Sequence, residues 1–210
     1  MSSVVRRRAY RRPAMKRAMR RLGKSRVSVA NMHYKYEQTV GVGSIASSTT
    51  LPTENNFAFT LSQLPQASTF SALYDAYRIT KVELKFYPRS NVNAGNAGTN
   101  YTTTFHTAID YDDVSNLGSL NSLLQYQTLK SFQSTKYCTR TVVPRVADSV
   151  YISGVSTGYA ENKSNQWLDC ASDTVPHYGI RTWLGDVGGL AGAVTFDVFA
   201  KFHIEFKAVR

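Results

Sequence analysis

Apolar and polar residues alternate most regularly near the end of the chain. Between residues 194 and 206 every second position is apolar, and most of the positions between are polar. The apolar set is Val194, Phe196, Val198, Ala200, Phe202, Ile204 and Phe206. Successive side chains of a β-strand point to opposite faces, so this pattern predicts a strand with one face on a core and the other toward solvent or a neighbouring subunit. Phe199 is the one large exception in the polar set.

A second strand is predicted for residues 78–87, with Val82, Leu84 and Phe86 inward and charged residues between them. It ends at Pro88, which has no N–H to donate to a ladder. Six weaker patterns raise the number of strands to eight. They lie at residues 31–40, 56–61, 101–109, 129–134, 136–146 and 178–184.

Helical periodicity is confined to two short connections, residues 68–77 and 114–126. Two such segments are too few for repeated βαβ units. Eight strands with long connections instead fit a two-sheet sandwich, and the jelly roll is the eight-stranded member of that group. The sequence therefore predicts an all-β fold, an eight-stranded antiparallel jelly-roll sandwich.

The positive charge of the chain is concentrated at its N-terminus. The whole chain carries 25 Lys and Arg against 14 Asp and Glu, a formal net charge of +11. Residues 1–26 contain no acidic residue and eleven cations, which equal the whole excess. These are Arg6, Arg7, Arg8, Arg11, Arg12, Lys16, Arg17, Arg20, Arg21, Lys24 and Arg26. We therefore predict a basic N-terminal arm at 1–26 and one folded, formally neutral domain at 27–210.

A cationic segment of this density is typical of a tail that binds a polyanion. Lys and Arg side chains on phosphates release condensed counterions, so binding is strong, salt-sensitive and independent of sequence. If all eleven cations contact a single strand, log K falls with log salt at a slope of roughly −8. The alternatives are a solvated tail or a nuclear-import signal alone, and a membrane-bound helix, for which the apolar stripe of Met15, Ala18, Met19 and Leu22 is small.

The sequence offers no convincing catalytic, cofactor or metal site. Residues 154–158 match GxSxG, but no helix pattern follows, and residues 41–46 match GxGxxA, which we interpret as a glycine-containing turn. Asp110, Asp112 and Asp113 could ligate a cation, although a solvated strand end explains them as well. The four histidines are scattered, so we expect no enzyme, no cofactor and no metal.

No apolar run approaches the ~20 residues that span a bilayer, so we expect no membrane anchor. Cys138 and Cys170 have no CxxC spacing, and the N-terminal residues have no apolar stretch typical of a secretory signal, so we expect a reduced, intracellular site of synthesis and no need for a disulfide. The loop at 154–176, with Tyr159 and Trp167, is a candidate contact between subunits, because aromatic side chains are favoured at interfaces.

Two segments resemble a known family. Residues 70–88 read FSALYDAYRITKVELKFYP, and residues 196–207 read FDVFAKFHIEFK. The first resembles the segment leading into strand D of capsid proteins from circular Rep-encoding single-stranded DNA viruses, the circovirus-like group. The second resembles their last strand, and the arginine-rich N-terminus resembles their packaging arm.

The resemblance implies a single jelly roll that self-assembles into a small icosahedral shell of the T=1 kind. It also implies an inward-facing arm on a single-stranded DNA genome, import into the host nucleus by an import receptor, and a final location in the virion. Two alternatives stay open: the capsid protein of a small or satellite RNA virus, and a cellular nucleic-acid-binding β-sandwich protein.

Overall fold

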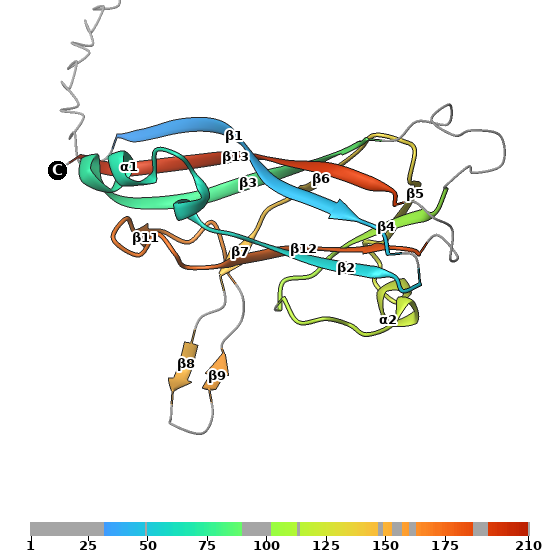
Figure 1. The fold of residues 1–210 in the computed structure, drawn as a ribbon. Coiled ribbons are helices and arrows are strands. Elements are labelled where there is room, and N and C mark those ends of the chain that lie inside the picture. Colours follow the sequence, from blue (N-terminus) through green and yellow to red (C-terminus); the bar gives the residue numbers. More distant parts are fainter. Residues whose placement is uncertain are drawn as a thin grey trace, which may run out of the picture.

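Two antiparallel β-sheets face each other in the computed structural model and form the two layers seen in Figure 1. The structure describes residues 32–48, 50–89, 102–112, 114–146, 149–152, 157–159, 163–186 and 193–209. We call the layer that contains the first and last strands sheet A, and the other layer sheet B.

In sheet A the last strand of the chain lies between the first strand and a third, long strand. The members of sheet A are β1 (His33–Ala46), β13 (Thr195–Val209), β3 (Tyr74–Pro88), β6 (Cys138–Val142) and β11 (Leu168–Asp169). The strand β13 pairs with β1 along one edge and with β3 along the other. The second edge of β3 is shared by β6 and β11.

Sheet B is organised around β12, which pairs with β2 on one edge and with β4 and β7 on the other. Its members are β2 (Thr53–Phe59), β4 (Thr104–Ile109), β5 (Lys130–Gln133), β7 (Arg145–Val146), β10 (Lys163–Ser164) and β12 (His177–Leu184). A separate two-stranded ribbon is formed by β8 (Ser149–Ile152) and β9 (Thr157–Tyr159) and extends away from both sheets in Figure 1.

Helices are short in the described part of the chain. They are η2 (Leu61–Gln63), a 3-10 turn, α1 (Ala67–Leu73) and α2 (Leu120–Leu124). Both α-helices fall within or beside the predicted helical segments but are shorter. Because β3 already begins at Tyr74, the predicted helix at 68–77 ends early.

Eight strands account for the main body, and all eight overlap a strand predicted from the sequence. They are β1, β3, β6 and β13 in sheet A and β2, β4, β5 and β12 in sheet B. The chain crosses repeatedly between the two sheets, so strands distant in sequence are neighbours. The all-β jelly-roll prediction is confirmed, and the additional short strands β7 to β11 all lie between β6 and β12.

Aromatic side chains fill the space between the sheets. All seven alternating apolar residues predicted for the last strand are buried. Phe206 is fully buried, and its ring stacks on Phe70 at 4.7 Å and on Tyr74 at 4.9 Å between centroids. At the other end of β13, Phe196 stacks on Phe105 at 4.8 Å. The inward face of β13 therefore contacts the core along its whole length.

Two predicted elements differ from the structure. The predicted strand at 136–146 is two strands, because the chain leaves sheet A after Val142 and enters sheet B at Arg145. Pro144 lies at this crossing, where its missing N–H breaks no ladder. The interpretation of 41–46 as a turn is wrong, because this segment continues β1 through a β-bulge at Gly41/Gly43. Gly43 has φ 114°, which only glycine adopts without strain.

Replacing Phe206 with Ala should destabilise the fold by about 3–5 kcal/mol, because it removes a ring that is fully buried and stacked on two other rings. Phe199→Ala is the matched control on the same strand, since its ring is 38% exposed, and should cost about 1 kcal/mol or less. Urea denaturation measures both, and equal losses would contradict the assignment of the two faces of β13.

Burial of His177 predicts a loss of stability in mild acid. Its Nδ1–H donates to the carbonyls of Phe59 and Val175 at 3.1 and 3.0 Å, and burial lowers its pKa to about 4. In the unfolded chain the pKa of His177 is near 6.5. Between this pH and about 4, the histidine therefore binds a proton in the unfolded chain but not in the folded one. This lowers stability as pH falls from about 6.5 to about 4, by a total on the order of 3 kcal/mol.

The substitution His177→Asn should make the stability between these two pH values less dependent on pH, because the amide can donate to the same carbonyls and does not titrate. His33→Asn, at an exposed histidine, is the control and should leave the dependence unchanged. Urea midpoints recorded across the range provide the measurement. A pH profile identical to that of the parent protein would rule out His177 as the source.

Candidate nucleic-acid and assembly surfaces

The residues predicted to bind phosphate all lie outside the described residues. They are Arg6, Arg7, Arg8, Arg11, Arg12, Lys16, Arg17, Arg20, Arg21, Lys24 and Arg26. The predicted boundary between the arm and the folded domain, at residues 26 and 27, lies there too. The description begins at Met32, directly before β1. The structure does describe the surface of sheet A around the start of β1.

An aromatic and cationic cluster lies at the start of β1. The Trp167 ring has the guanidinium of Arg78 and the ammonium of Lys207 each 4.5 Å from its centroid, and the His33 ring at 5.1 Å. Cations over an indole face are attracted by the ring quadrupole. Trp167 thus contacts three strands of its own sheet. The predicted role of the 154–176 loop between subunits stays a prediction, and residues 154–156 and 160–162 of the loop lie outside the description.

Charged side chains cover the solvent-facing side of sheet A, which we call the outer face of sheet A. Its charged members are Lys35, Glu37, Arg78, Lys81, Glu83, Lys85, Arg89, Asp169, Asp197, Lys201, Glu205 and Lys207, together with His203. Among these described residues there are seven Lys or Arg side chains against five carboxylates, a surplus of two positive charges. The alternation along β3 and β13 predicted that the charged residues between the apolar positions face outward, but it indicated no role for them.

One group of ion pairs centres on Glu205. Its carboxylate lies 2.6 Å from the Arg78 guanidinium and 3.3 Å from the Lys35 ammonium. Burial alone would raise the pKa of Glu205, but the hydrogen bonds from Arg78 and Lys35 outweigh it and lower that pKa. Glu205 is therefore ionised at neutral pH and fixes the two cations in place.

A second group centres on His203. Its Nδ1 lies 3.0 Å from Glu37 and its Nε2 lies 3.2 Å from Glu83, so both ring nitrogens face carboxylates. Each carboxylate also pairs with a lysine at 2.6 Å, Glu37 with Lys201 and Glu83 with Lys81. These lysine hydrogen bonds lower the pKa of both glutamates. The row of alternating charges thus crosses β1, β13 and β3.

A shallow groove of about 400 Å³ runs between these two groups of ion pairs. Its lining includes Lys35, Lys81, His203 and Glu205. The groove lies where β3 and β13 shift register at His203/Ile204. A register shift bends a strand and re-aims its side chains, which explains a hollow in an otherwise regular face.

The outer face of sheet B differs because the chain itself covers it. The connection between β4 and β5 crosses this face and carries α2, as Figure 1 shows. Leu123 of α2 packs with Ala108 and Trp183 in a second small core, against which further apolar residues of the connection pack. This part of sheet B is shielded from water, whereas the outer face of sheet A has no comparable cover among the described residues.

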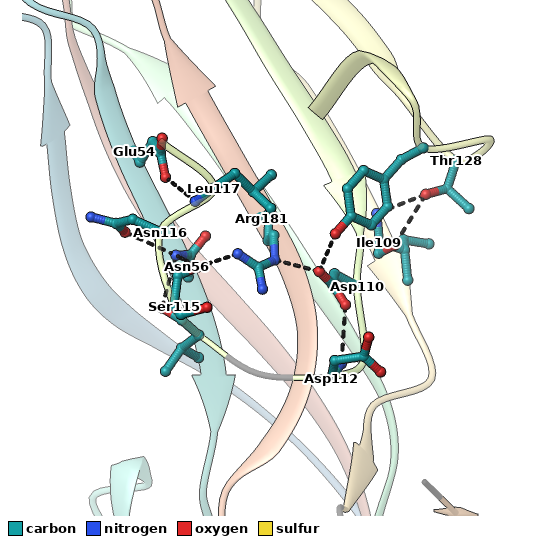
Figure 2. Close-up of polar contacts among 12 residues, drawn as sticks. Glu54, Asn56, Ile109, Asp110, Asp112, Ser115, Asn116, Leu117, Thr128 and Arg181 are labelled. Atoms are coloured by element: carbon teal, nitrogen blue, oxygen red, sulfur yellow. Dashed lines mark hydrogen bonds and ion pairs between the residues drawn. The ribbon is translucent and has the colours of Figure 1, made fainter. Parts of the chain in front are cut away.

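A buried ion pair holds this cover in place (Figure 2). Arg181 of β12 lies 2.5 Å from the carboxylate of Asp110, and both side chains are only 5% exposed. Arg181 also donates to the Ser115 carbonyl. Tyr126 donates to Asp110 at 2.5 Å, and burial together with this hydrogen bond raises the pKa of Tyr126 to about 12. The pair therefore ties β12 to both ends of the connection.

Two polar side chains of β2 bind the same connection from the other side. Glu54 accepts hydrogen bonds from the backbone N–H groups of Leu117 and Gly118 at 2.9 and 3.0 Å. Asn56 donates to the carbonyls of Val114 and Ser115 at 2.9 and 3.0 Å. Figure 2 shows both side chains reaching toward the loop. Four backbone hydrogen-bonding groups of the loop are thus paired with side chains of β2.

The acidic cluster at 110–113 is explained differently from either sequence interpretation. Asp110 is buried and pairs with Arg181, so it is not part of a solvated strand end. Asp112 donates its backbone N–H to Asp110 at 3.0 Å, and Asp113 lies outside the description. Among the described residues there is no group of three His, Cys, Asp or Glu side chains that could hold a metal ion.

One protein family matches the sequence over nearly its whole length, namely the circovirus capsid protein family, over residues 2–210. The chain belongs to this family. The match confirms the resemblance inferred from residues 70–88 and 196–207. Capsid proteins are structural components of virions, and this assigns the chain to that class. No curated protein sequence matches the capsid protein.

Solved capsid structures share the fold at low sequence identity. A crystal structure of a 60-mer of the BFDV capsid protein has a TM-score of 0.67 and 15% identity, covering 85% of this chain and 95% of that one. A decameric BFDV capsid protein gives a TM-score of 0.58 and 16% identity, covering 84% and 100%. Cucumber necrosis virus gives 0.54 and 13%, covering 85% and 57%. These likenesses support the jelly-roll fold of the capsid protein.

Within the described part of the capsid protein, no helix is both long and apolar enough to cross a bilayer. The GxSxG match at 154–158 has residues 154–156 outside the description, and residues 157 and 158 lie in β9. A nucleophile elbow requires a helix directly after the turn. The element that follows here is a strand.

The buried ion pair predicts strong coupling between Asp110 and Arg181. Asp110→Leu should destabilise the capsid protein by about 3–5 kcal/mol, because it leaves a buried guanidinium without its counterion. Adding Arg181→Met should recover a large part of that loss, with a coupling energy of about 2 kcal/mol or more. Urea denaturation of the single and double variants measures the cycle.

Asp197→Leu is the control for this cycle, because Asp197 pairs with Arg89 at 2.6 Å on the exposed outer face of sheet A. Exposed ion pairs are screened by water, so this change should have a much smaller effect. Additive losses from Asp110→Leu and Arg181→Met would show that the pair is not what holds the cover.

Proposed function

We propose that this capsid protein self-assembles into a closed icosahedral shell of sixty copies, with T=1 geometry, around single-stranded DNA bound by its arm. The jelly-roll domain forms the wall, and residues 1–26 bind the phosphates of the genome. The observation that carries the proposal is the segregation of charge. All eleven excess cations precede residue 27 in a chain whose family is that of the circovirus capsid.

Two further observations support assembly into a shell. The BFDV capsid protein, with the same fold, occurs as a 60-mer and as a decamer. Ion pairs also link three strands on the outer face of sheet A, and a buried ion pair holds the cover on sheet B, so we expect neither described surface to reorganise much on contact. Surfaces that do not need to reorganise on contact bind with a smaller entropic cost.

The arm accounts for packaging through phosphate contacts that are independent of sequence. A shell must enclose a genome whatever its sequence, and a cationic segment does so without base recognition. Arginine-rich clusters such as Arg6 to Arg12 also act as nuclear-import signals, so we propose that an import receptor binds the same arm and brings the protein to the host nucleus. No catalytic step is part of this function.

Negative-stain electron microscopy of the purified protein tests the shell directly, with uniform round particles as the expected result. Digestion of the contents with DNase and with RNase then identifies the nucleic acid. Sensitivity to DNase alone is expected, whereas contents destroyed only by RNase would contradict the assignment of DNA. Material that stays monomeric at every salt concentration would contradict the shell.

Changing Arg6, Arg7, Arg8, Arg11 and Arg12 to Gln should reduce the dependence of DNA binding on salt. Six cations remain, so the slope of log K against log salt should change from roughly −8 to roughly −4. The same variant should remain in the cytoplasm of transfected cells if the cluster binds an import receptor. Fluorescence anisotropy with a single-stranded oligonucleotide and cell imaging measure the two effects.

Lys130→Gln is the control for this variant, because Lys130 is an exposed lysine on sheet B. It should change the slope by no more than about one unit. A slope that is unchanged by the five substitutions would place the phosphate contacts outside the first half of the arm.

A further inference from the structure

Three aromatic rings lie in contact on the outer face of sheet A. Tyr87 of β3 has its ring 4.8 Å from that of Tyr137 and 5.7 Å from that of Phe199 on β13. The three side chains are 43%, 50% and 38% exposed. They come from three separate segments of the chain, and we call them the ring cluster.

The ring cluster is unusual for its position. Its neighbours on the outer face of sheet A are charged, and most are held in ion pairs, whereas these rings contact mainly one another. Phe199 is also the residue that breaks the polar alternation of the last strand. Exposed aromatic clusters on a sheet mark surfaces that bind partners, and the flat faces of nucleobases stack on such rings.

Cations accompany the rings. Lys85 lies directly across from Phe199 in the β3–β13 register, and Arg89 follows Tyr87 by two residues, just after the end of β3. Arg89 is paired with Asp197, which holds it beside the cluster. The outer face of sheet A carries a surplus of two positive charges among its described residues. Rings combined with positive charge fit a ligand that has bases and phosphates together.

The ring cluster and the start of β1 lie at opposite ends of the same face. His33, at the start of β1, pairs with Lys207, and Phe199 lies eight residues from Lys207 along β13. This separation is roughly 26 Å at about 3.3 Å per residue. A stacked single strand at about 3.4 Å per nucleotide covers it with about eight nucleotides. The groove lined by Lys35 and Lys81 lies between the two ends.

We propose that the outer face of sheet A is a binding track for single-stranded DNA, with bases stacking on Tyr87, Tyr137 and Phe199. This rests on the proposed function, because it adds a contact of the wall to the contacts of the arm. The arm supplies attraction to phosphates, and the ring cluster supplies stacking. The track faces the packaged DNA, and the covered face of sheet B points away from it.

The test uses the full-length chain and a roughly 20-nucleotide oligodeoxythymidylate, long enough to extend past the track. At about 0.5 M salt the phosphate contribution of the arm is weak, so stacking contributes more of the affinity. The variant Tyr87→Leu with Tyr137→Leu should bind at least about fivefold more weakly at this salt. Its salt slope should not change, because neither side chain carries charge.

Three controls make this result specific. Tyr87→Phe with Tyr137→Phe keeps both rings and should bind like the parent protein. Leu124→Ala removes an exposed apolar side chain from the cover of sheet B and should have no effect. Oligouridylate in place of the DNA shows whether the track also accepts RNA, and affinity at least as high for RNA would overturn the assignment to DNA.

Photo-cross-linking gives a second, independent measurement on the parent protein. An oligonucleotide with 5-iododeoxyuridine should cross-link to the peptides that contain Tyr87 and Tyr137. Cross-links confined to residues 1–26, with affinity unchanged in the Leu variant, would overturn the track while leaving the proposed function of the arm intact. Normal DNA affinity with loss of particles would also overturn it and would make the ring cluster a contact between subunits.

Discussion

The pairing of β13 with two neighbours is the interaction on which the rest of the structure depends. Because β13 pairs with β1 along one edge and β3 along the other, a single strand connects the first and last parts of the folded chain. Its alternation gives one apolar side and one side that is polar except for Phe199. The apolar side makes the core with sheet B. Because β13 lies between β1 and β3, its polar side forms the middle of the outer face of sheet A.

The two outer surfaces of the sandwich are built in different ways as a result. On sheet B the β4–β5 connection adds a second small core and a buried ion pair, so the polar groups of Asp110 and Arg181 are satisfied away from water. A buried pair of this kind adds little net stability but is costly to break, and it therefore fixes one arrangement of the loop. On sheet A the charges remain in water and pair across strands. That surface stays open to a ligand.

Sequence periodicity was clearest for the strands with one buried and one solvent-facing side, such as β3 and β13. All eight predicted strands overlap a strand of the jelly roll, and the inward residues of β3 and β13 were identified correctly. Boundaries failed where the decisive contact is distant in sequence. The change of sheet at Pro144 and the continuation of β1 past Gly41 both depend on which strand lies alongside, which local alternation does not encode.

Contacts between residues distant in sequence also account for the functional features that the sequence did not reveal. The acidic residue Asp110 was interpreted as solvated or as a cation ligand, because no local pattern shows that residues 114–126 fold over it or that Arg181 lies beneath. The ring cluster left one signal, the aromatic Phe199 at a polar position of the last strand. Its partners, Tyr87 and Tyr137, join it only through strand pairing. The arm was visible at once, since charge composition needs no tertiary contact.

The carboxylates on the outer face of sheet A give the wall a role distinct from that of the arm. Glu37, Glu83 and Glu205 have lowered pKa values because lysine and arginine side chains donate to them, so they stay ionised at neutral pH. They cancel part of the positive charge of this face and hold the lysine and arginine side chains with which they pair. A wall with a large uncompensated charge would repel its own copies during assembly. A wall with nearly balanced charge and a few exposed rings can contact a polyanion at short range. The long-range attraction then comes from the arm, whose charge is separate from that of the wall.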